Sequence, residues 1–252
     1  MDSGLRDEIE GRFRQMCADS DRQSIVGFSS VQAVRLLPAQ ARYLQQKLQA
    51  LGDVGHVTAV SLGLFYHEQE ILGIPAGWRS KPSPDDRWNE YARAYRTLNG
   101  LLNRFTTVLA AQFDGVAEQA TVEGWVQKVG HATDYFPNCV SHRAFAEEAG
   151  VGWRGRHGLI VTPEGGPALR LATVFVPASI PVQHRELAGC GDCRACLEVC
   201  PILLKATECR EACRRRLGAL GLEDEVCGIC VRVCWEQVTA ELREGVLLRG
   251  AR

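Results

Sequence analysis

The sequence predicts an α+β fold, with a sandwich of helices and strands over residues 1–185 and a small cysteine-rich module over residues 186–252. Helical and extended hydrophobic patterns alternate in the first part, which is typical of a structure of two or three layers. All of the 11 cysteines except Cys17 and Cys139 lie in the second part. With 252 residues, 46% of them hydrophobic, the chain is long enough to bury one large core beside such a module.

The first elements expected are two helices that alternate with two strands. Leu5, Ile9 and Phe13 recur at helical spacing within residues 5–17, which indicates an amphipathic helix. The elements that follow are a strand over residues 25–28, a helix over 38–51 and a β-rich strand over 56–66, which we expect at the centre of the sheet.

The rest of the larger domain begins with a loop rich in proline and glycine over residues 73–86. A long helix is expected over 87–111, where large apolar residues form one broad stripe that is typical of a buried helix face. The remaining elements are a helix over 144–149, a glycine-dense turn, a strand over 159–162, a hairpin turn at 164–166 and a strand over 169–176.

One run of cysteines carries a recognisable metal-binding pattern. The segment Cys190-Gly-Asp-Cys193-Arg-Ala-Cys196-Leu-Glu-Val-Cys200-Pro201 has the spacing Cys-x2-Cys-x2-Cys-x3-Cys-Pro of bacterial ferredoxins that hold two iron–sulfur clusters. In that pattern the first three thiolates bind one cluster and the fourth binds the other. The sequence therefore predicts two [4Fe–4S] clusters in a ferredoxin-like module.

A second run, Cys227-Gly-Ile-Cys230-Val-Arg-Val-Cys234, supplies further ligands but lacks one cysteine of the complete motif. Cys209 or Cys213 can provide the missing ligand, and residue types alone do not decide between them. Structural zinc and disulfides are the alternatives, but zinc sites rarely interlock in this order. The favoured assignment gives one cluster Cys190, Cys193, Cys196 and Cys234, and gives the other Cys200, Cys227, Cys230 and Cys209.

The isolated cysteines and the charge balance carry less information. Cys17 and Cys139 are expected in the core, as lone cysteines usually are. The net charge of −1 argues against a global basic field that would collect nucleic acid. The local cluster Arg214-Arg215-Arg216 is interpreted as a solvated helix face or as a docking patch for an acidic electron donor.

The sequence contains no signal for a membrane or for export. The N-terminus lacks a basic region followed by an apolar stretch. No apolar run approaches the roughly 18 residues needed to span a bilayer. Because oxygen-sensitive clusters and unpaired thiols need reducing conditions, a cytoplasmic protein is expected.

The stretch Ala149-Gly150-Val151-Gly152-Trp153-Arg154-Gly155, the strand after it and the cysteine module together resemble the epoxyqueuosine reductases and the related reductive dehalogenases. The likeness extends over about residues 25–240. It implies a nitroreductase-like fold for the first domain, a cobalamin bound there, and clusters that deliver electrons to cobalt. Reduced ferredoxin or flavodoxin is the electron donor expected on this basis.

The resemblance also implies roles for residues of the first domain. Asp134 and Tyr135 precede the Gly-Trp-x-Gly turn on the side where the family has its proton donor, although Asp134 can equally cap a turn while Tyr135 packs. Glycines at a ligand site let the backbone approach a flat macrocycle, but they also form plain tight turns. The residues expected to bind the cofactor are Gly152, Trp153, Arg154, Gly155 and His157.

The substrate expected is a small molecule or a modified nucleoside. Only residues 235–252 follow the last cysteine, so the helical repeats with which the family binds tRNA are not expected, and neither is tRNA as a partner. Two alternatives to a cobalamin-dependent reductase stay open. One is a redox accessory protein that passes electrons to a partner, for example to reactivate a corrinoid protein, and the other is an enzyme with flavin in place of the corrinoid.

Overall fold

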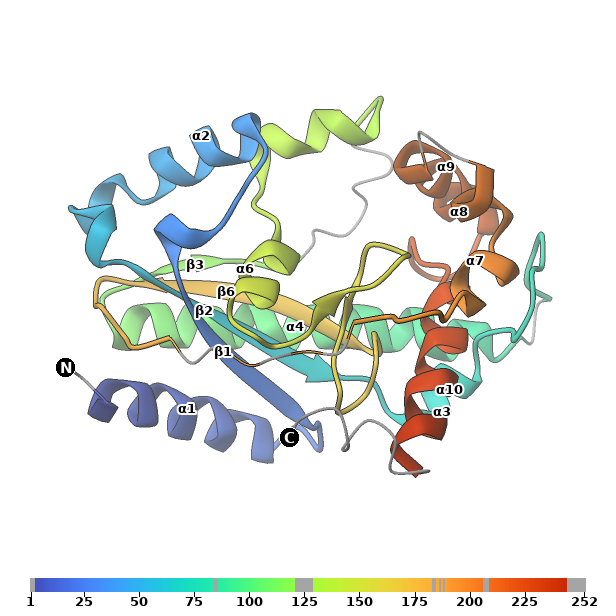
Figure 1. The fold of residues 1–252 in the computed structure, drawn as a ribbon, viewed down its shortest axis with the longest axis horizontal. Helices are drawn as coiled ribbons and strands as arrows, with labels where there is room; N and C mark the ends of the chain where they lie inside the picture. Colours follow the sequence, from blue (N-terminus) through green and yellow to red (C-terminus); the bar gives the residue numbers. More distant parts are fainter. Residues whose placement is uncertain are drawn as a thin grey trace.

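The computed structural model describes residues 3–83, 86–120, 129–182, 185, 187, 189–205 and 209–243. A four-stranded antiparallel sheet lies at its centre, with helices on both faces (Figure 1). Its order is β1 (Ser24–Ser30), β2 (Thr58–Phe65), β6 (Leu169–Val176) and β3 (Val116–Glu118). Every residue of β2 is buried because a strand pairs with it on each side and helices cover both faces. The predicted central strand is therefore confirmed.

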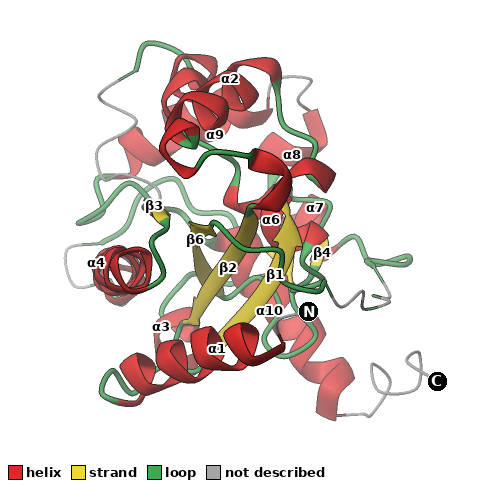
Figure 2. Ribbon diagram, turned by 90° about the vertical axis from the view of Figure 1, so that its left-hand side faces the viewer, coloured by secondary structure: helices red, strands yellow, loops and turns green. Residues whose placement is uncertain are grey.

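Helices α1 (Ser3–Ala18) and α4 (Trp88–Gln112) cover one face of the sheet (Figure 2). Successive side chains of a strand point to opposite faces, and Val60, Leu62 and Leu64 of β2 join the core on this side. The apolar stripe of α4 packs against them, with Trp88 and Leu98 fully buried. Burying one such side chain contributes about 1.5–3 kcal/mol, so both predicted helices are held by the core that they cover.

Helices α2 (Pro38–Lys47) and α6 (His142–Glu148) lie over the other face. Leu44 and Leu48 pack there with Phe145 of α6 and Phe175 of β6. The two phenylalanine rings meet edge to face, with centroids 5.3 Å apart, a geometry that aromatic pairs prefer. The expected helices over 38–51 and 144–149 are confirmed to within a few residues.

Short elements connect these layers. They include the 3₁₀ helix η4, which contains Asp134 and lies between α2 and the cysteine module. The complete set is η1 (Val31–Ala33), η2 (Gln49–Leu51), η3 (Val54–His56), α3 (Glu68–Leu72), η4 (Ala132–Asn138), β4 (Trp153–Arg154) and β5 (Ile160–Val161).

The hairpin predicted between residues 159–162 and 169–176 is wrong in its pairing. Strand β5 pairs with β4 in a separate two-stranded sheet, whereas β6 pairs with β2 and β3. A glycine makes the β4–β5 pairing possible, because a Cβ atom on Gly152 would overlap the carbonyl oxygen of Val161. The partner of a strand is thus decided here by close backbone approach and not by nearness in sequence.

The cysteine-rich part forms short helices at one end of the sheet (Figure 1). Trp88 of α4 donates a hydrogen bond from Nε1 to the carbonyl oxygen of Cys227 at 2.5 Å. Ile229 and Val231 belong to the same apolar core as α1 and α4. The helices are α7 (Ala195–Val199), α8 (Pro201–Lys205), α9 (Cys209–Leu220) and α10 (Ile229–Arg243). The division into domains at residues 185 and 186 stays a prediction, and residue 186 lies outside the described residues.

Among the described helices, none has the length and the apolar composition needed to cross a bilayer.

Candidate functional site

The cysteines that the sequence assigns to the first cluster come together from distant parts of the module. The thiol of Cys234, on α10, interacts electrostatically with those of Cys190, Cys193 and Cys196. Helices α7 and α10 pack against each other and bring these side chains to one place. This proximity agrees with the crossing of the last cysteine to the first motif, which stays a prediction from the spacing.

The second group of cysteines is centred on Cys230, whose thiol interacts with those of Cys213, Cys227 and Cys200, and also with that of Cys196 from the first group. Cys200 crosses to this group from the first motif, as the spacing predicts. The fourth member is Cys213 of α9, where the sequence analysis favours Cys209. The side chain of Cys209 lies outside the described residues.

The electrostatics of both groups suit a cationic centre. Burial raises the pKa values of Cys230 and Cys234, and the neighbouring thiols raise them further. Several buried thiolates at close range repel one another unless positive charge lies between them, and iron–sulfur clusters are held by cysteine thiolates in this way. Among the residues that the structure describes, no group of three or more His, Cys, Asp or Glu is arranged to hold a single metal ion.

Two side chains outside the cysteine motifs hydrogen-bond to sulfurs of these groups. Trp153 donates from Nε1 to Sγ of Cys190, and Arg216 donates from Nε to Sγ of Cys227, both at 3.4 Å. Arg216 also stacks on the ring of Trp78 at 3.7 Å. Hydrogen bonds to ligand sulfurs are among the factors that set a cluster potential. Sequence reasoning interpreted Arg216 only as part of a basic cluster and gave Trp78 no role, because neither has a motif that relates it to a cysteine.

The turn predicted to bind the cofactor packs against the first cysteine loop. Besides the contact of Trp153, Arg156 donates to the carbonyl oxygens of Gly191 at 2.7 Å and Cys193 at 3.0 Å. Arg154 points elsewhere and forms an exposed ion pair with Glu147 at 2.7 Å. The turn thus joins the larger domain to the cysteine module.

The glycines of this turn do not form an open cradle for a macrocycle. A Cβ on Gly152 would overlap β5, and a Cβ on Gly155 would lie 2.8 Å from both His157 and Val161. Gly158 has φ +81°, a left-handed conformation that favours glycine in a tight turn. All three glycines are thus explained by local folding, so at these positions the residues do not fit a corrinoid.

His157 is likewise held by its own turn. Its Nδ1 accepts a hydrogen bond from the backbone N–H of Leu159 at 3.1 Å, and its buried Nε2 faces Gly155 without a hydrogen-bond partner among the described residues. Burial, aided by the nearby charge of Arg143, lowers the pKa of His157 to about 4, so the ring is neutral at neutral pH.

Two cavities, of about 840 and 380 Å³, are lined by segments other than this turn.

Gly152→Ala is expected to destabilise the protein by about 1–3 kcal/mol, because the new methyl group must displace the backbone of β5. The matched control is Gly100→Ala, at an exposed position of α4 where a Cβ meets nothing within 4 Å. This control should be neutral or stabilising by up to about 1 kcal/mol. Anaerobic urea unfolding of both variants measures the difference, and equal stabilities would contradict the close contact of β4 with β5.

The predicted proton donor lies on η4, next to helix α9. Asp134 is exposed, and its Oδ2 accepts a hydrogen bond from the backbone N–H of His131 at 2.7 Å. His131 in turn accepts at Nδ1 from the N–H of Thr133 at 3.3 Å, which completes a capping box. Tyr135 is half-buried. The capping role that the sequence analysis left open is therefore present.

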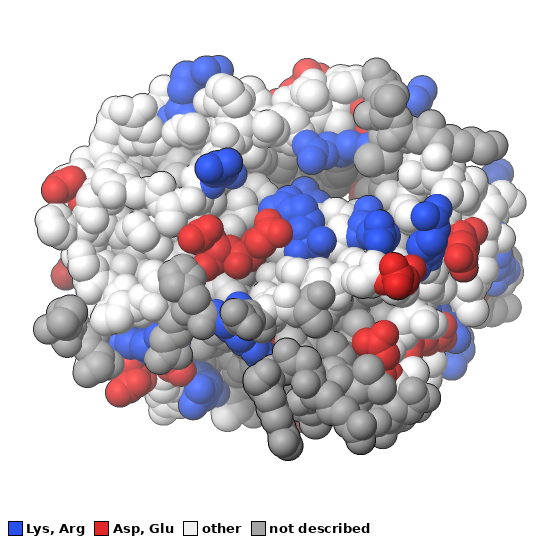
Figure 3. All heavy atoms as spheres, viewed as in Figure 1, with Lys and Arg blue, Asp and Glu red and all other residues white. Residues whose placement is uncertain are grey.

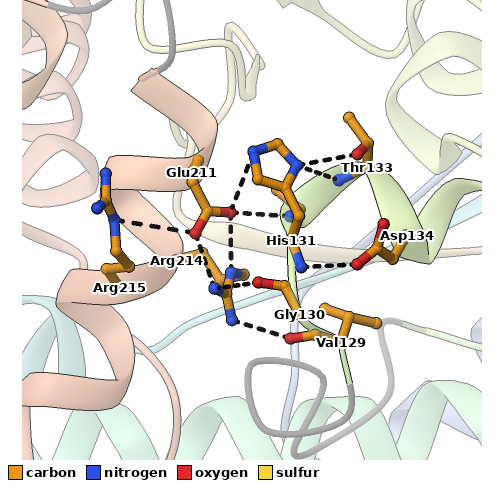
Figure 4. A network of polar contacts seen from close by, with 9 residues as sticks. Val129, Gly130, His131, Thr133, Asp134, Glu211, Arg214 and Arg215 are labelled. Atoms are coloured by element: carbon orange, nitrogen blue, oxygen red, sulfur yellow. Dashed lines mark hydrogen bonds and ion pairs between the residues drawn. The ribbon is translucent and has the colours of Figure 1, made fainter.

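Glu211 and Arg214 of α9 hold this segment from the other side (Figure 4). Hydrogen bonds from Arg214 and from the backbone of Ala132 lower the pKa of Glu211 to about 2. Sequence reasoning grouped Arg214 with its basic neighbours and assigned Glu211 no role. The spacing of three residues between them was the one available signal, since it allows an ion pair on a helix.

Basic side chains also mark the outer surface of the site. A row of Lys and Arg crosses the middle of the face seen in Figure 1 (Figure 3). Arg154, Arg156 and Arg194, which are all exposed, lie in or beside the turn and the first cysteine loop. A local concentration of arginines attracts phosphates even where the net charge of the chain is close to zero.

Comparison with known proteins gives one consistent group of relatives. No family model matches the chain. An epoxyqueuosine reductase of Xanthomonas campestris pv. campestris is 25% identical over 154 residues, which are 61% of this chain and 43% of the relative. An epoxyqueuosine reductase of Alicycliphilus denitrificans is 32% identical over 157 residues, covering 59% of this chain and 40% of the relative. The chain thus spans less than half the length of these relatives.

Solved structures agree with these sequence matches. The structure of epoxyqueuosine reductase from Streptococcus thermophilus matches 93% of this chain and 66% of its own, with a TM-score of 0.50 and 17% identity. This likeness establishes a shared mixed α/β fold with an antiparallel sheet. This likeness does not test the finer prediction of a nitroreductase-like first domain.

The expectation that tRNA is not a partner is contradicted by the comparisons. A crystal structure of epoxyqueuosine reductase with an epoxyqueuosine-modified stem loop of tRNA-Tyr matches 79% of this chain and 52% of that one, with a TM-score of 0.43 and 19% identity. The named relatives of this chain are epoxyqueuosine reductases as well. The expectation rested on the short segment after the last cysteine, and the end of a sequence does not determine which nucleic acid its other surfaces bind.

Proposed function

We propose that this chain, a relative of the epoxyqueuosine reductases, is an oxidoreductase that reduces a modified nucleoside in tRNA with electrons from two [4Fe–4S] clusters. The observation that carries the proposal is the convergence of two groups of four cysteines, each with one member that crosses from the other motif. Such crossing is characteristic of proteins with two clusters. The exposed arginines beside the first group support a polyanionic substrate.

The ligands proposed for the first cluster are Cys190, Cys193, Cys196 and Cys234. Those proposed for the second are Cys200, Cys213, Cys227 and Cys230, so that Cys213 takes the place first given to Cys209. When bound, the clusters would supply single electrons at low potential. We further propose that residues 1–185 form the nitroreductase-like domain that receives the substrate, and that residues 186–252 form the ferredoxin-like module.

Removal of an epoxide oxygen as water consumes two electrons and two protons. A reductase for such a substrate therefore needs a proton donor as well as an electron source. Asp134 is the proposed donor, with Tyr135 in a secondary role. The capping bond to His131 holds the carboxyl group of Asp134 in one orientation.

Cobalamin is the electron acceptor that the resemblance implies, and the glycine turn predicted for it does not fit. The test is to reconstitute the protein with iron and sulfide in the presence and absence of cobalamin. A corrinoid spectrum that stays with the protein after gel filtration would show that the protein binds cobalamin.

The function is tested by anaerobic reduction of a tRNA stem loop that contains epoxyqueuosine, with titanium(III) citrate as the chemical reductant. We expect loss of the epoxide oxygen, observed by mass spectrometry of the digested RNA, in the reconstituted protein and not in Cys227→Ala. The same stem loop without the modification is the binding control. Reducible clusters without any turnover would contradict the proposal and favour an electron-carrying accessory protein.

A further inference from the structure

One face of α9 is attached to the segment over residues 129–138, which contains η4. Arg210, Glu211 and Arg214 occupy positions i, i+1 and i+4 of the helix and therefore share one side. The guanidinium group of Arg210 lies 4.8 Å from the centroid of the Phe136 ring. Arg214 donates hydrogen bonds to the carbonyl oxygens of residues 129 and 130, at 3.1 and 2.8 Å. The first part of the helix thus contacts the segment at several points.

Glu211 is the centre of these contacts (Figure 4). Its Oε2 accepts the backbone N–H of Ala132 at 2.8 Å. The same carboxylate pairs with Arg214 through two hydrogen bonds, Nε to Oε2 at 2.9 Å and the terminal nitrogen to Oε1 at 2.7 Å. The side chains of Glu211 and Arg214 are only 9% and 12% exposed. Because this ion pair has two hydrogen bonds and is largely buried, it is stronger than a surface ion pair.

Arg215 provides a natural contrast on the same helix. Its side chain is 68% exposed, and its Nε lies 3.8 Å from Oε1 of Glu211. An exposed pair at this distance contributes little. Removal of Arg215 therefore perturbs the charge of α9 without removing a contact to the segment.

Helix α9 also contributes a residue to the second group of cysteines. Cys213 directly precedes Arg214 and lies among the thiols around Cys230. The helix is thus fixed on one side by a proposed cluster ligand and on the other by η4. Segment 129–138 carries Asp134, whose capping bond to His131 depends on the path of this backbone.

We propose that Glu211 and Arg214 are positioning residues, which make the placement of segment 129–138, with Asp134 on it, depend on assembly of the second cluster. The inference rests on the proposed function, because it takes Cys213 as a cluster ligand. Metal binding that orders α9 contributes free energy to every contact that α9 makes. The coupling is reciprocal, so loss of the contacts to η4 must also weaken the hold on the cluster.

Hydrogen exchange of the Ala132 amide reports the contact directly, since this N–H is bonded to Glu211. We expect exchange at Ala132 to rise by about tenfold or more in reconstituted Glu211→Ala, and to rise similarly in the wild-type protein after iron removal. Iron should also leave Glu211→Ala faster than wild type in the presence of a chelator. Arg215→Gln should match the wild-type protein in all three measurements.

Each remaining outcome is decisive. The inference would be overturned if the Ala132 amide exchanged at the wild-type rate in Glu211→Ala. It would also be overturned if iron removal raised the exchange of amides in α9 but not that of Ala132. If Glu211→Ala does not fold, Arg214→Lys keeps the charge but loses the planar fork, and it should show the same increase. A wild-type protein that binds no iron would overturn the proposed function and the coupling together, whereas an intact cluster with unchanged exchange would overturn the coupling alone.

Discussion

Cys234→Ala is expected to lower the iron content of the reconstituted protein from about eight to about four atoms per chain. The replacement removes the thiol that α10 contributes to Cys190, Cys193 and Cys196. With three cysteines left, the first cluster loses one of its four proposed ligands. Iron and acid-labile sulfide, measured on anaerobically purified protein, give the result.

Matched variants make this test specific. Cys200→Ala should remove the other cluster, because Cys200 lies with Cys230. Cys213→Ala should do the same, whereas Cys209→Ala should keep the iron. Cys17→Ala, at a buried position of α1, serves as the control and should retain both clusters. Two zinc ions per chain without sulfide would contradict the assignment, and a loss of iron in Cys209→Ala alone would restore the ligand first favoured.

The sequence was informative where local spacing decides the structure. The apolar stripe of α4 and the continuous apolar run of β2 predict a buried helix and a central strand, because the period of a pattern follows from the geometry of one element. In both elements the residues of one segment are sufficient for the prediction. The crossing of Cys200 and Cys234 stays a prediction that rests on the spacing of the two cysteine runs.

Sequence reasoning could not decide where the answer depends on how distant segments meet. Cys209 and Cys213 are four residues apart on α9, so the sequence left the choice of ligand between them open, and Cys213 is the proposed ligand. In the same way, β5 pairs with β4 because Gly152 permits a close approach that no turn motif indicates. Contacts of this kind depend on tertiary packing, which overrides local preference.

The assignment of Asp134 is the prediction that most directly tests the proposed chemistry. Asp134→Asn is expected to lower the rate of epoxide reduction by about 10² to 10⁴, the usual effect of losing a positioned general acid. The asparagine oxygen can still accept the N–H of His131, so the capping box and the stability of η4 should be retained. The substitution thus removes the group proposed to donate the proton and keeps the oxygen that accepts the hydrogen bond. Steady-state turnover and thermal unfolding of the same preparation measure both effects.

Asp134→Ala separates the two roles of the carboxyl group further. It removes the acid and the acceptor together, so turnover should fall as in Asp134→Asn, with an additional loss of about 1 kcal/mol of stability. Tyr135→Phe should have a smaller effect on turnover than either. If Asp134→Asn turns over like the wild-type protein while Asp134→Ala is less stable, Asp134 only caps η4. If Tyr135→Phe instead shows the larger loss, the phenol is the acid, and the capping bond of Asp134 to His131 holds the tyrosine beside the substrate.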